Sequence, residues 1–132
     1  MHAHVFTVGE AQALLPTLRQ RLRSALSSWR TIVSSREEVT LASKNAQWNG
    51  GSADGPRYLA AIEALGDTVR QISGLGVLVK DLESGLCDFP CVHEGRLVYL
   101  CWRLGESRIE WWHEVDAGFA GRQPLRDGLG EN

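Results

Sequence analysis

Apolar residues in the first third of the sequence recur at spacings of three and four, which is the period of an amphipathic helix. The stripe consists of Leu15, Leu18, Leu22, Leu26, Trp29 and Val33. Just before it, Thr7 and Glu10 have the spacing of a capping box, in which each side chain accepts a hydrogen bond from the other residue's backbone N–H. We therefore expect a helix that begins near Thr7, buries this stripe and extends to about Leu41. Pro16 lacks a backbone N–H, so the helix should kink or restart there.

A second helical pattern follows, in which the apolar residues keep the same period and stop before two closely spaced glycines. These residues are Tyr58, Ile62, Leu65, Val69 and Ile72. Residues 43–55 are polar and Gly-rich, which is typical of a connection between helices. Trp48 is the exception in that connection, and we expect it to pack back onto the helices. The two patterns predict an antiparallel helical hairpin over residues 6–76.

After residue 76 the period of the apolar positions changes to 2, which is the period of β-strands. The predicted strands span residues 77–79, 86–89, 96–103 and 108–115. Pro90 should close the second strand, and Gly105 permits a tight turn between the last two. We expect a small antiparallel sheet of three to four strands. It forms a β-meander that, with a Gly-rich loop, occupies residues 77–125, and residues 126–132 form a flexible tail.

Together these elements predict an α+β fold, in which the hairpin packs on one face of the sheet and residues 1–132 form one domain. If the turn at Gly105 is symmetric, the face toward the helices carries Val98, Leu100, Trp102, Ile109, Trp111 and His113. The opposite face then carries Tyr99, Cys101, Arg103, Arg108, Glu110 and Trp112. Because that face is also rich in large apolar groups, we expect the following loop, a second subunit or a ligand to cover it.

Composition and charge narrow the class of protein. The sequence lacks an apolar run of the roughly 20 residues that cross a bilayer, and it lacks the features of a signal peptide, so we expect a cytoplasmic protein with no membrane partner. Its three cysteines are expected to be free thiols. The first 50 residues carry six Lys and Arg against three Asp and Glu, and the remainder carries eight against thirteen. This asymmetry favours contacts within the chain or between subunits over nucleic-acid binding.

The candidate site lies where the last predicted strand ends and the Gly-rich loop begins. The strand end presents His113, and the glycines of the loop let backbone N–H groups approach an anion closely. Arg122 can hold a carboxylate or a phosphate through two parallel hydrogen bonds. The predicted ligand-binding residues are Asp88, Arg96, His113, Asp116, Gly118, Gly121 and Arg122.

Metal and nucleophilic chemistry are alternatives for the same region. One is a zinc site built from Cys87, Cys91, His93, Cys101 and His113. Its spacing fits none of the usual zinc patterns, so no metal is assigned. Another is a divalent-metal or acid–base site built from His113 with Asp88, Glu106, Glu110, Glu114 and Asp116. Such carboxylates are more often solvated or ion-paired. Cys101 as a nucleophile needs a nearby base, and the predicted register places His113 on the opposite face.

Three blocks of the sequence are rich in uncommon residues: FTVGEAQALLPTL, LGVLVKDLESGLCDFP and GRLVYLCWRLGESRIEWWHEVDAGFAGRQPL. Through them the chain resembles, over nearly its whole length, a bacterial family catalogued as domain of unknown function 2203. The matching residues are Asp81, Gly85, Asp88, Phe89, Gly95, Arg96, Leu100, Cys101, Trp102, Gly105, Glu106, Trp112, His113, Gly118, Phe119, Gly121 and Arg122. Cys87 and Cys91 depart from the pattern, which weakens any scheme that needs those two thiols. The resemblance implies no particular activity or cofactor.

The sequence supports three functions, which we give from the most to the least favoured. The first is a binding or regulatory protein in which His113, Asp116 and Arg122 contact a small anionic or metal-associated ligand. The second is a structural or scaffold protein that acts through dimerisation or partner docking, with the same polar residues forming a network that stabilises the fold. An enzyme of unknown reaction is third. We expect a homo-oligomer, because two helices cover only one face of the sheet. In the second function Arg122 pairs internally with Asp88, Asp116 or Glu114.

Overall fold

The computed structural model describes residues 4–44, 55–126 and 129. The chain divides into two compact units, one made of Met1–Leu22 with Gln71–Asn132 and the other of Arg23–Arg70. Most of the predicted connection, including Trp48, and most of the predicted tail lie outside the described residues. Among the described residues, no helix carries an apolar segment long enough to span a bilayer.

Helix α1 spans Val8–Lys44 and begins with the predicted capping box. The backbone N–H of Thr7 donates to Oε1 of Glu10 over 2.8 Å, and the N–H of Glu10 donates to Oγ1 of Thr7 over 3.1 Å. The helix continues through Pro16 without a break, so the restart does not occur, and the alternative, a kink at Pro16, stays a prediction. A proline inside a helix costs about 3 kcal/mol. Burial of the neighbouring Leu15 and Leu18, at about 1.5–3 kcal/mol each, offsets that cost.

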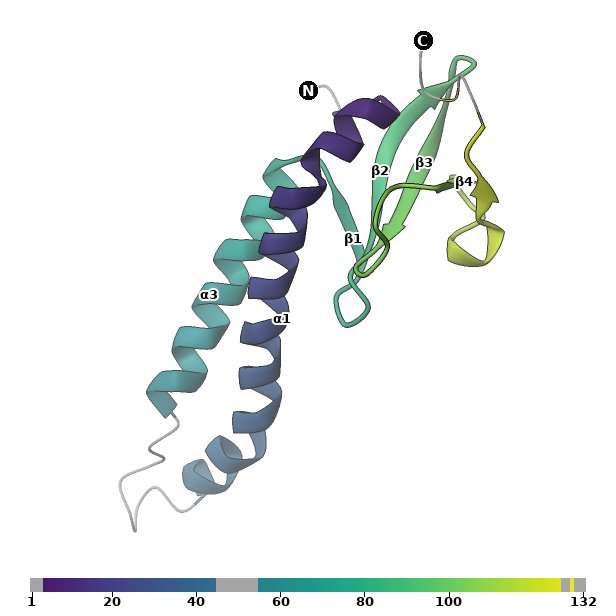
Figure 1. Ribbon diagram of the computed structural model, residues 1–132. Helices are drawn as coiled ribbons and strands as arrows, with labels where there is room; N and C mark the ends of the chain where they lie inside the picture. The colour runs from purple at the N-terminus through teal and green to yellow at the C-terminus, as the bar shows by residue number, and fades with distance from the viewer. Residues whose placement is uncertain (1–3, 45–54, 127–128, 130–132) are drawn as a thin grey trace. The chain divides into compact units, whose positions relative to one another are not determined.

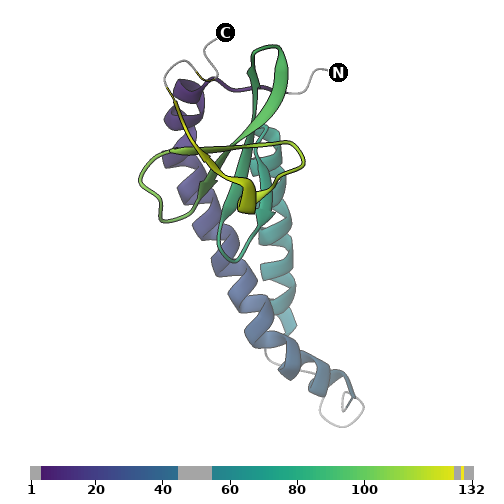
Figure 2. The same cartoon turned by 90° about the vertical axis from the view of Figure 1, so that its right-hand side faces the viewer.

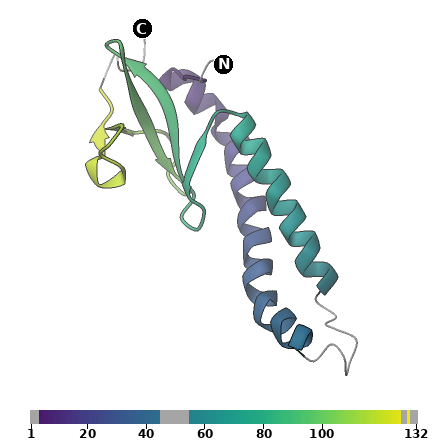
Figure 3. The same ribbon diagram turned by 180° about the vertical axis from the view of Figure 1, so that it is seen from behind.

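The second unit contains the later turns of α1 and most of α3, which spans Gly55–Gly74. Within this unit the two helices lie side by side and run in opposite directions (Figures 1 and 3). The predicted apolar stripes are only partly buried, since Val33 is 53%, Ile62 42% and Val69 47% exposed. On α3 the predicted Ile72 is buried and the predicted Tyr58 and Leu65 are partly buried, whereas Ala61 and Thr68 are buried in place of Ile62 and Val69. The helical period is therefore correct, and the predicted stripe is confirmed in part.

The sheet belongs to the first unit and is an antiparallel meander in the order β1-β2-β3-β4-β5 (Figures 1 and 2). Its strands span Leu78–Asp81, Leu86–His93, Arg96–Arg103, Trp111–Glu114 and Gln123–Pro124. The fold class is α+β as predicted, with five strands rather than three or four. The additional strand, β5, has two residues and pairs with Trp111 and Trp112. Two residues are too few for a period to reveal a strand.

Strand β2 continues to His93 instead of ending at Pro90. Proline is tolerated at a strand edge, because its missing N–H then leaves no sheet hydrogen bond unmade. The pairing of β1 with β2 stops at Asp88, so β1 does not cover the edge of β2 at Pro90. The carbonyl oxygen of Pro90 accepts a hydrogen bond from the backbone N–H of Phe6 over 2.7 Å. The segment before α1 thus occupies this part of the edge.

The core of the first unit lies between α1 and one face of the sheet. It consists of Phe6, Ala11, Leu15, Leu18, Leu22, Ile72, Val77, Cys87, Phe89, Cys91, Val98, Leu100, Trp102, Ile109, Trp112 and Leu129. Trp102 is fully buried, and its indole N–H donates to the carbonyl oxygen of Glu106 over 3.0 Å. The core face therefore carries Leu100 and Trp102 as predicted, and Trp112 takes the position predicted for Trp111. Ile109 is buried as predicted, but it lies outside the sheet.

The register between β3 and β4 differs by one residue from the symmetric turn. Leu100 pairs with Trp112, and Cys101 pairs with Trp111. Because side chains alternate between the faces of a strand, a shift of one residue exchanges the two faces of β4. Trp111 and His113 therefore lie on the same face as Cys101, contrary to the prediction. We call this the outer face.

The shift arises because residues 104–110 leave the sheet between β3 and β4. Ile109 enters the core, where it is 2% exposed. Its backbone N–H donates to Oε1 of Gln12 over 3.0 Å, and Nε2 of Gln12 donates to its carbonyl oxygen over 3.4 Å. The Gln12 amide on α1 thus takes the hydrogen-bonding place of a neighbouring strand. The turn at Gly105 is consequently longer than the predicted one.

Candidate functional site

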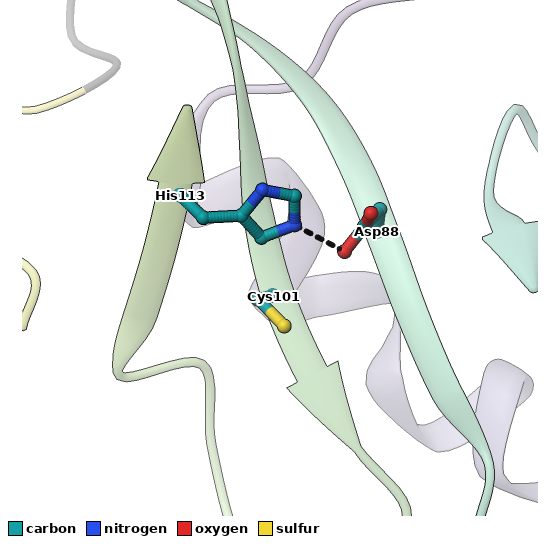
Figure 4. A group of neighbouring side chains, drawn as sticks. All are labelled: Asp88, Cys101 and His113. Atoms are coloured by element: carbon teal, nitrogen blue, oxygen red, sulfur yellow. Dashed lines mark hydrogen bonds and ion pairs between the residues drawn. The ribbon is translucent and has the colours of Figure 1, made fainter. Parts of the chain in front are cut away.

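Three adjacent strands place a carboxylate, a thiol and an imidazole together on the outer face (Figure 4). Asp88 of β2 pairs directly with Cys101 of β3, and His113 of β4 lies two residues further along, opposite Tyr99. Their potential ligand atoms all lie within 4.8 Å of one another. Asp88 and His113 are each 2% exposed, and Cys101 is fully buried. We call these three residues the buried polar cluster.

Both ring nitrogens of His113 have hydrogen-bond partners. Nδ1 lies 2.7 Å from the carbonyl oxygen of Glu114, and Nε2 lies 3.0 Å from Oδ1 of Asp88. A carbonyl oxygen can only accept, so Nδ1 carries a proton. A bare Nε2 and an ionised carboxylate would then direct lone pairs at each other, so a second proton lies between them. With that proton the His113–Asp88 pair has no net charge.

Cys101 lies on the same face as His113, but its surroundings do not favour nucleophilic chemistry. Burial raises the pKa of its thiol, and a hydrogen bond from Nε of Arg122 to Sγ, 3.3 Å long, offsets this only in part. Nε2 of His113 is engaged by Asp88. A nucleophile needs a thiolate that a substrate can reach. The fully buried Cys101 lacks that access.

Arg122 is held by the side chains around it. Nη1 and Nη2 donate to the two carboxylate oxygens of Glu106 over 2.9 and 2.7 Å. The guanidinium carbon lies 4.6 Å from the centre of the Phe119 ring and 5.4 Å from that of Trp111. The Arg122 side chain is 12% exposed. Its partner is thus Glu106, rather than Asp88, Asp116 or Glu114.

The Arg122–Glu106 pair is ionised. Burial is the largest single influence and opposes the charge of Glu106, but the hydrogen bonds from Arg122 and from the backbone N–H of Arg103, together with the charges of both arginines, outweigh it, so the pKa of Glu106 lies below its ordinary value of 4.5. Burial likewise lowers the pKa of Arg122 while the hydrogen bonds to Glu106 raise it, with a net rise. The pair therefore stays charged at neutral pH.

The glycines of the loop after β4 serve a tight turn. Gly118 has a φ of 64°, a conformation that residues with a Cβ rarely adopt. A Cβ at Gly121 would lie 2.5 Å from that of Ala117, which is too close for any side chain. These glycines let residues 115–122 return over the outer face and carry Arg122 to Cys101.

The structure distributes the seven predicted site residues over several places. Asp88 and His113 form the buried pair, while Gly118, Gly121 and Arg122 belong to the returning loop. Asp116 is exposed. Arg96 donates from Nε and Nη2 to the carboxylate of Glu114 over 3.2 and 2.7 Å. The hydrogen bond from Arg96 also lowers the pKa of Glu114.

A cavity of about 380 Å³ lies beside the β2–β3 turn, and we call it the turn cavity. It is lined by His93, Glu94, Arg96, Trp112, Gln123, Arg126 and Leu129. The buried Nδ1 of His93 has no hydrogen-bond partner among the described residues. Among the predicted site residues, Arg96 lines this cavity. Gln123 and Arg126 were missed, because only their return beside β4 brings them here.

Comparison with known proteins places the chain in a family. Residues 4–125 match the family described as an uncharacterized conserved protein, domain of unknown function 2203. The chain belongs to this family. The resemblance inferred from the sequence is thereby confirmed, and the matched range includes the whole buried polar cluster. The search of curated proteins gives no match, and neither does the search of solved structures. Any function for this member of the family must therefore be argued from its own geometry.

Proposed function

We propose that this protein is a binding or regulatory protein that holds a small anionic ligand in the turn cavity. The observation that carries the proposal is a cavity lined by two arginines and by His93, whose buried Nδ1 has no hydrogen-bond partner among the described residues. Buried polar atoms almost always have a hydrogen-bond partner. A ligand that supplies an acceptor or a donor to Nδ1 would provide one.

The cavity presents hydrogen-bond donors that suit an anion. Arg96 and Arg126 bring guanidinium groups, and the carboxylates of Glu94 in the lining and of Glu114, the partner of Arg96, balance their charges. Gln123 adds an amide that donates two hydrogen bonds. The volume lies within the range of about 300–1,000 Å³ that is typical of small-molecule sites. A small metabolite with a carboxylate or phosphate group fits both these donors and the size.

Arg96 is already oriented for such a ligand. Its Nε and Nη2 each donate to Glu114, which holds the guanidinium in one position. A guanidinium has five N–H donors in a planar fork, so donors remain for a ligand. A side chain that is held in place before binding loses less conformational entropy on binding. Arg96 thus supports the proposal although it is ion-paired.

Binding of inorganic phosphate and of succinate, measured by isothermal titration calorimetry, tests the proposal. We expect Arg126→Ala to weaken binding of the preferred probe at least about tenfold, the effect of losing roughly 1.4 kcal/mol. Arg108→Ala is the matched control, because Arg108 is an exposed arginine that does not line the cavity. Equal affinities in parent and Arg126→Ala, or no binding of either probe, would exclude the proposed site.

A second candidate function is self-association through an apolar patch on the outer face. The patch consists of Val92, Leu97 and Val115, which are 39%, 42% and 52% exposed, and Val92 pairs directly with Leu97. Single exposed apolar residues are common, but several on one face mark an interaction surface. A two-fold dimer places the same patch against itself, and an apolar patch meets this requirement without opposing like charges. This candidate corresponds to the structural role considered from the sequence.

A further inference from the structure

The buried polar cluster has the composition of a transition-metal site. One carboxylate, one thiol and one imidazole come from three neighbouring strands, and their ligand atoms lie within 4.8 Å of one another. We propose that Asp88, Cys101 and His113 bind one divalent transition-metal ion, with Zn²⁺ the best fit to the ligands. This site is separate from the turn cavity and does not depend on the proposed function.

The ligand types select the metal. Mg²⁺ and Ca²⁺ prefer oxygen ligands, so a thiolate and an imidazole argue against both. Zn²⁺ binds Cys, His and Asp side chains together, most often with tetrahedral geometry. Three protein ligands leave the fourth position of a tetrahedral ion for water or another small ligand.

The hydrogen bond of His113 to Glu114 is the arrangement expected around a metal-binding histidine. Such a histidine usually donates its other ring N–H to a carboxylate or a backbone carbonyl, which fixes the tautomer and the ring orientation. Nδ1 of His113 lies 2.7 Å from the Glu114 carbonyl oxygen, and this directs Nε2 toward Asp88. Zinc bonds of about 2.0–2.1 Å at a tetrahedral angle need about 3.3 Å between N and O. The 3.0 Å between Nε2 and Oδ1 is close to that separation.

Charge balance is compatible with a buried ion. Without metal, one proton lies between His113 and Asp88, and the Cys101 thiol carries another. Binding of Zn²⁺ releases both protons. The two positive charges of the ion then replace those of the two protons, and the cluster stays neutral. The Arg122 guanidinium, 3.3 Å from Sγ of Cys101, can donate to the thiolate while Glu106 balances its charge. An isolated buried charge, which would be costly, is thereby avoided.

The other two cysteines provide internal controls. Cys87 and Cys91 lie on the core face of β2, opposite to the face of Asp88. The zinc site weighed from the sequence used both of them and omitted Asp88. The present site shares only Cys101 and His113 with it.

Metal content of the purified full chain tests the proposal. The protein is incubated with Zn²⁺, dialysed against metal-free buffer and analysed by plasma mass spectrometry. We expect about one zinc ion per chain, which His113→Ala and Cys101→Ser lose while Cys87→Ala and Cys91→Ala keep it. Circular dichroism of each variant distinguishes loss of metal from loss of fold.

Cobalt substitution tests the thiolate ligand directly in the parent protein. In the parent, Co²⁺ should give a thiolate-to-cobalt charge-transfer band in the near ultraviolet, and Zn²⁺ should displace it. Folded parent that retains no metal after dialysis, or a band that survives Cys101→Ser, would overturn the proposal. Neither result would affect phosphate or succinate binding in the turn cavity, so the two proposals fail independently.

Discussion

Arg122 and Glu106 form a bidentate ion pair on the outer face of the sheet. Nη1 and Nη2 of Arg122 lie 2.9 and 2.7 Å from the two carboxylate oxygens of Glu106. The two residues are 16 positions apart in the sequence, with Glu106 before β4 and Arg122 after it. Their pairing joins the loop after β3 to the loop after β4. It also places the Arg122 guanidinium against Cys101.

Removing Arg122 should destabilise the fold. Arg122→Ala leaves the Glu106 carboxylate, 22% exposed, without its partner, and we expect a cost of about 1–3 kcal/mol, below the 3–5 kcal/mol of a fully buried pair. Urea denaturation measures the cost. Arg108→Ala removes an exposed ion pair and should change stability by less than about 0.5 kcal/mol. Equal midpoints for Arg122→Ala and the parent would contradict this account.

The same pair predicts how stability depends on pH. Burial raises the pKa of Glu106, while the hydrogen bonds from Arg122 and the Arg103 backbone and the charges of both arginines together lower it by more, so the folded pKa lies below the ordinary value of 4.5. This contribution is present above pH 4.5 and is lost as the pH falls from there through the folded pKa. Parent and Glu106→Gln should therefore differ in thermal midpoint at neutral pH and converge in acid. If the thermal midpoints of parent and Glu106→Gln differed by the same amount from pH 7 into the acid range, Glu106 would not contribute through an ionised pair with Arg122.

The register of β4 predicts unequal roles for its two tryptophans. Trp112 is 9% exposed in the core, whereas Trp111 is half-buried on the outer face. Trp112→Ala should cost about 3–5 kcal/mol, as should Trp102→Ala, because both leave a large cavity. Trp111→Ala should cost less, since it mainly removes contacts with Arg122. Chemical denaturation of the three variants gives the ranking, and a larger cost for Trp111→Ala would favour the symmetric register.

Glu94 occupies an unfavourable backbone conformation in the β2–β3 turn. Its φ is 51°, and that of the following Gly95 is 77°. Asparagine adopts positive φ at lower cost than glutamate, and Asn-Gly is the preferred pair in such turns. Glu94→Asn should therefore raise stability by about 0.5–1 kcal/mol. It also removes a negative charge from the turn cavity, so phosphate should bind more tightly, and weaker binding would count against an anion site there.

The apolar patch on the outer face predicts a dimer. Light scattering should give about twice the chain mass of 14.6 kDa, and Leu97→Lys should give the monomer, because it places like charges in the contact. Leu59→Lys on α3 is the matched control, since Leu59 is 60% exposed and lies outside the patch. If the parent protein has a mass of 14.6 kDa at micromolar concentration, self-association through this patch is excluded as a function.

Local signals in the sequence determined much of this fold. The capping box at Thr7, the helical periods and the change to a period of 2 depend on residues within a few positions of one another. Such signals identify α1, α3 and β3 and the α+β class. They also mark Asp88, Cys101, His113 and Arg122 as unusual residues. Interactions between neighbouring residues are sufficient to produce these features, so they can be read without knowledge of the tertiary structure.

Contacts between residues far apart in the sequence decided the features that local signals do not determine. The register of β4 depends on Gln12, which is 97 positions from the Ile109 backbone that it holds. That single-residue shift brings His113 to the face of Asp88 and Cys101. The partner of Arg122 and the lining of the turn cavity depend likewise on how the chain returns after β4. Because side-chain direction alternates at every residue of a strand, the site follows from register, and register follows from packing.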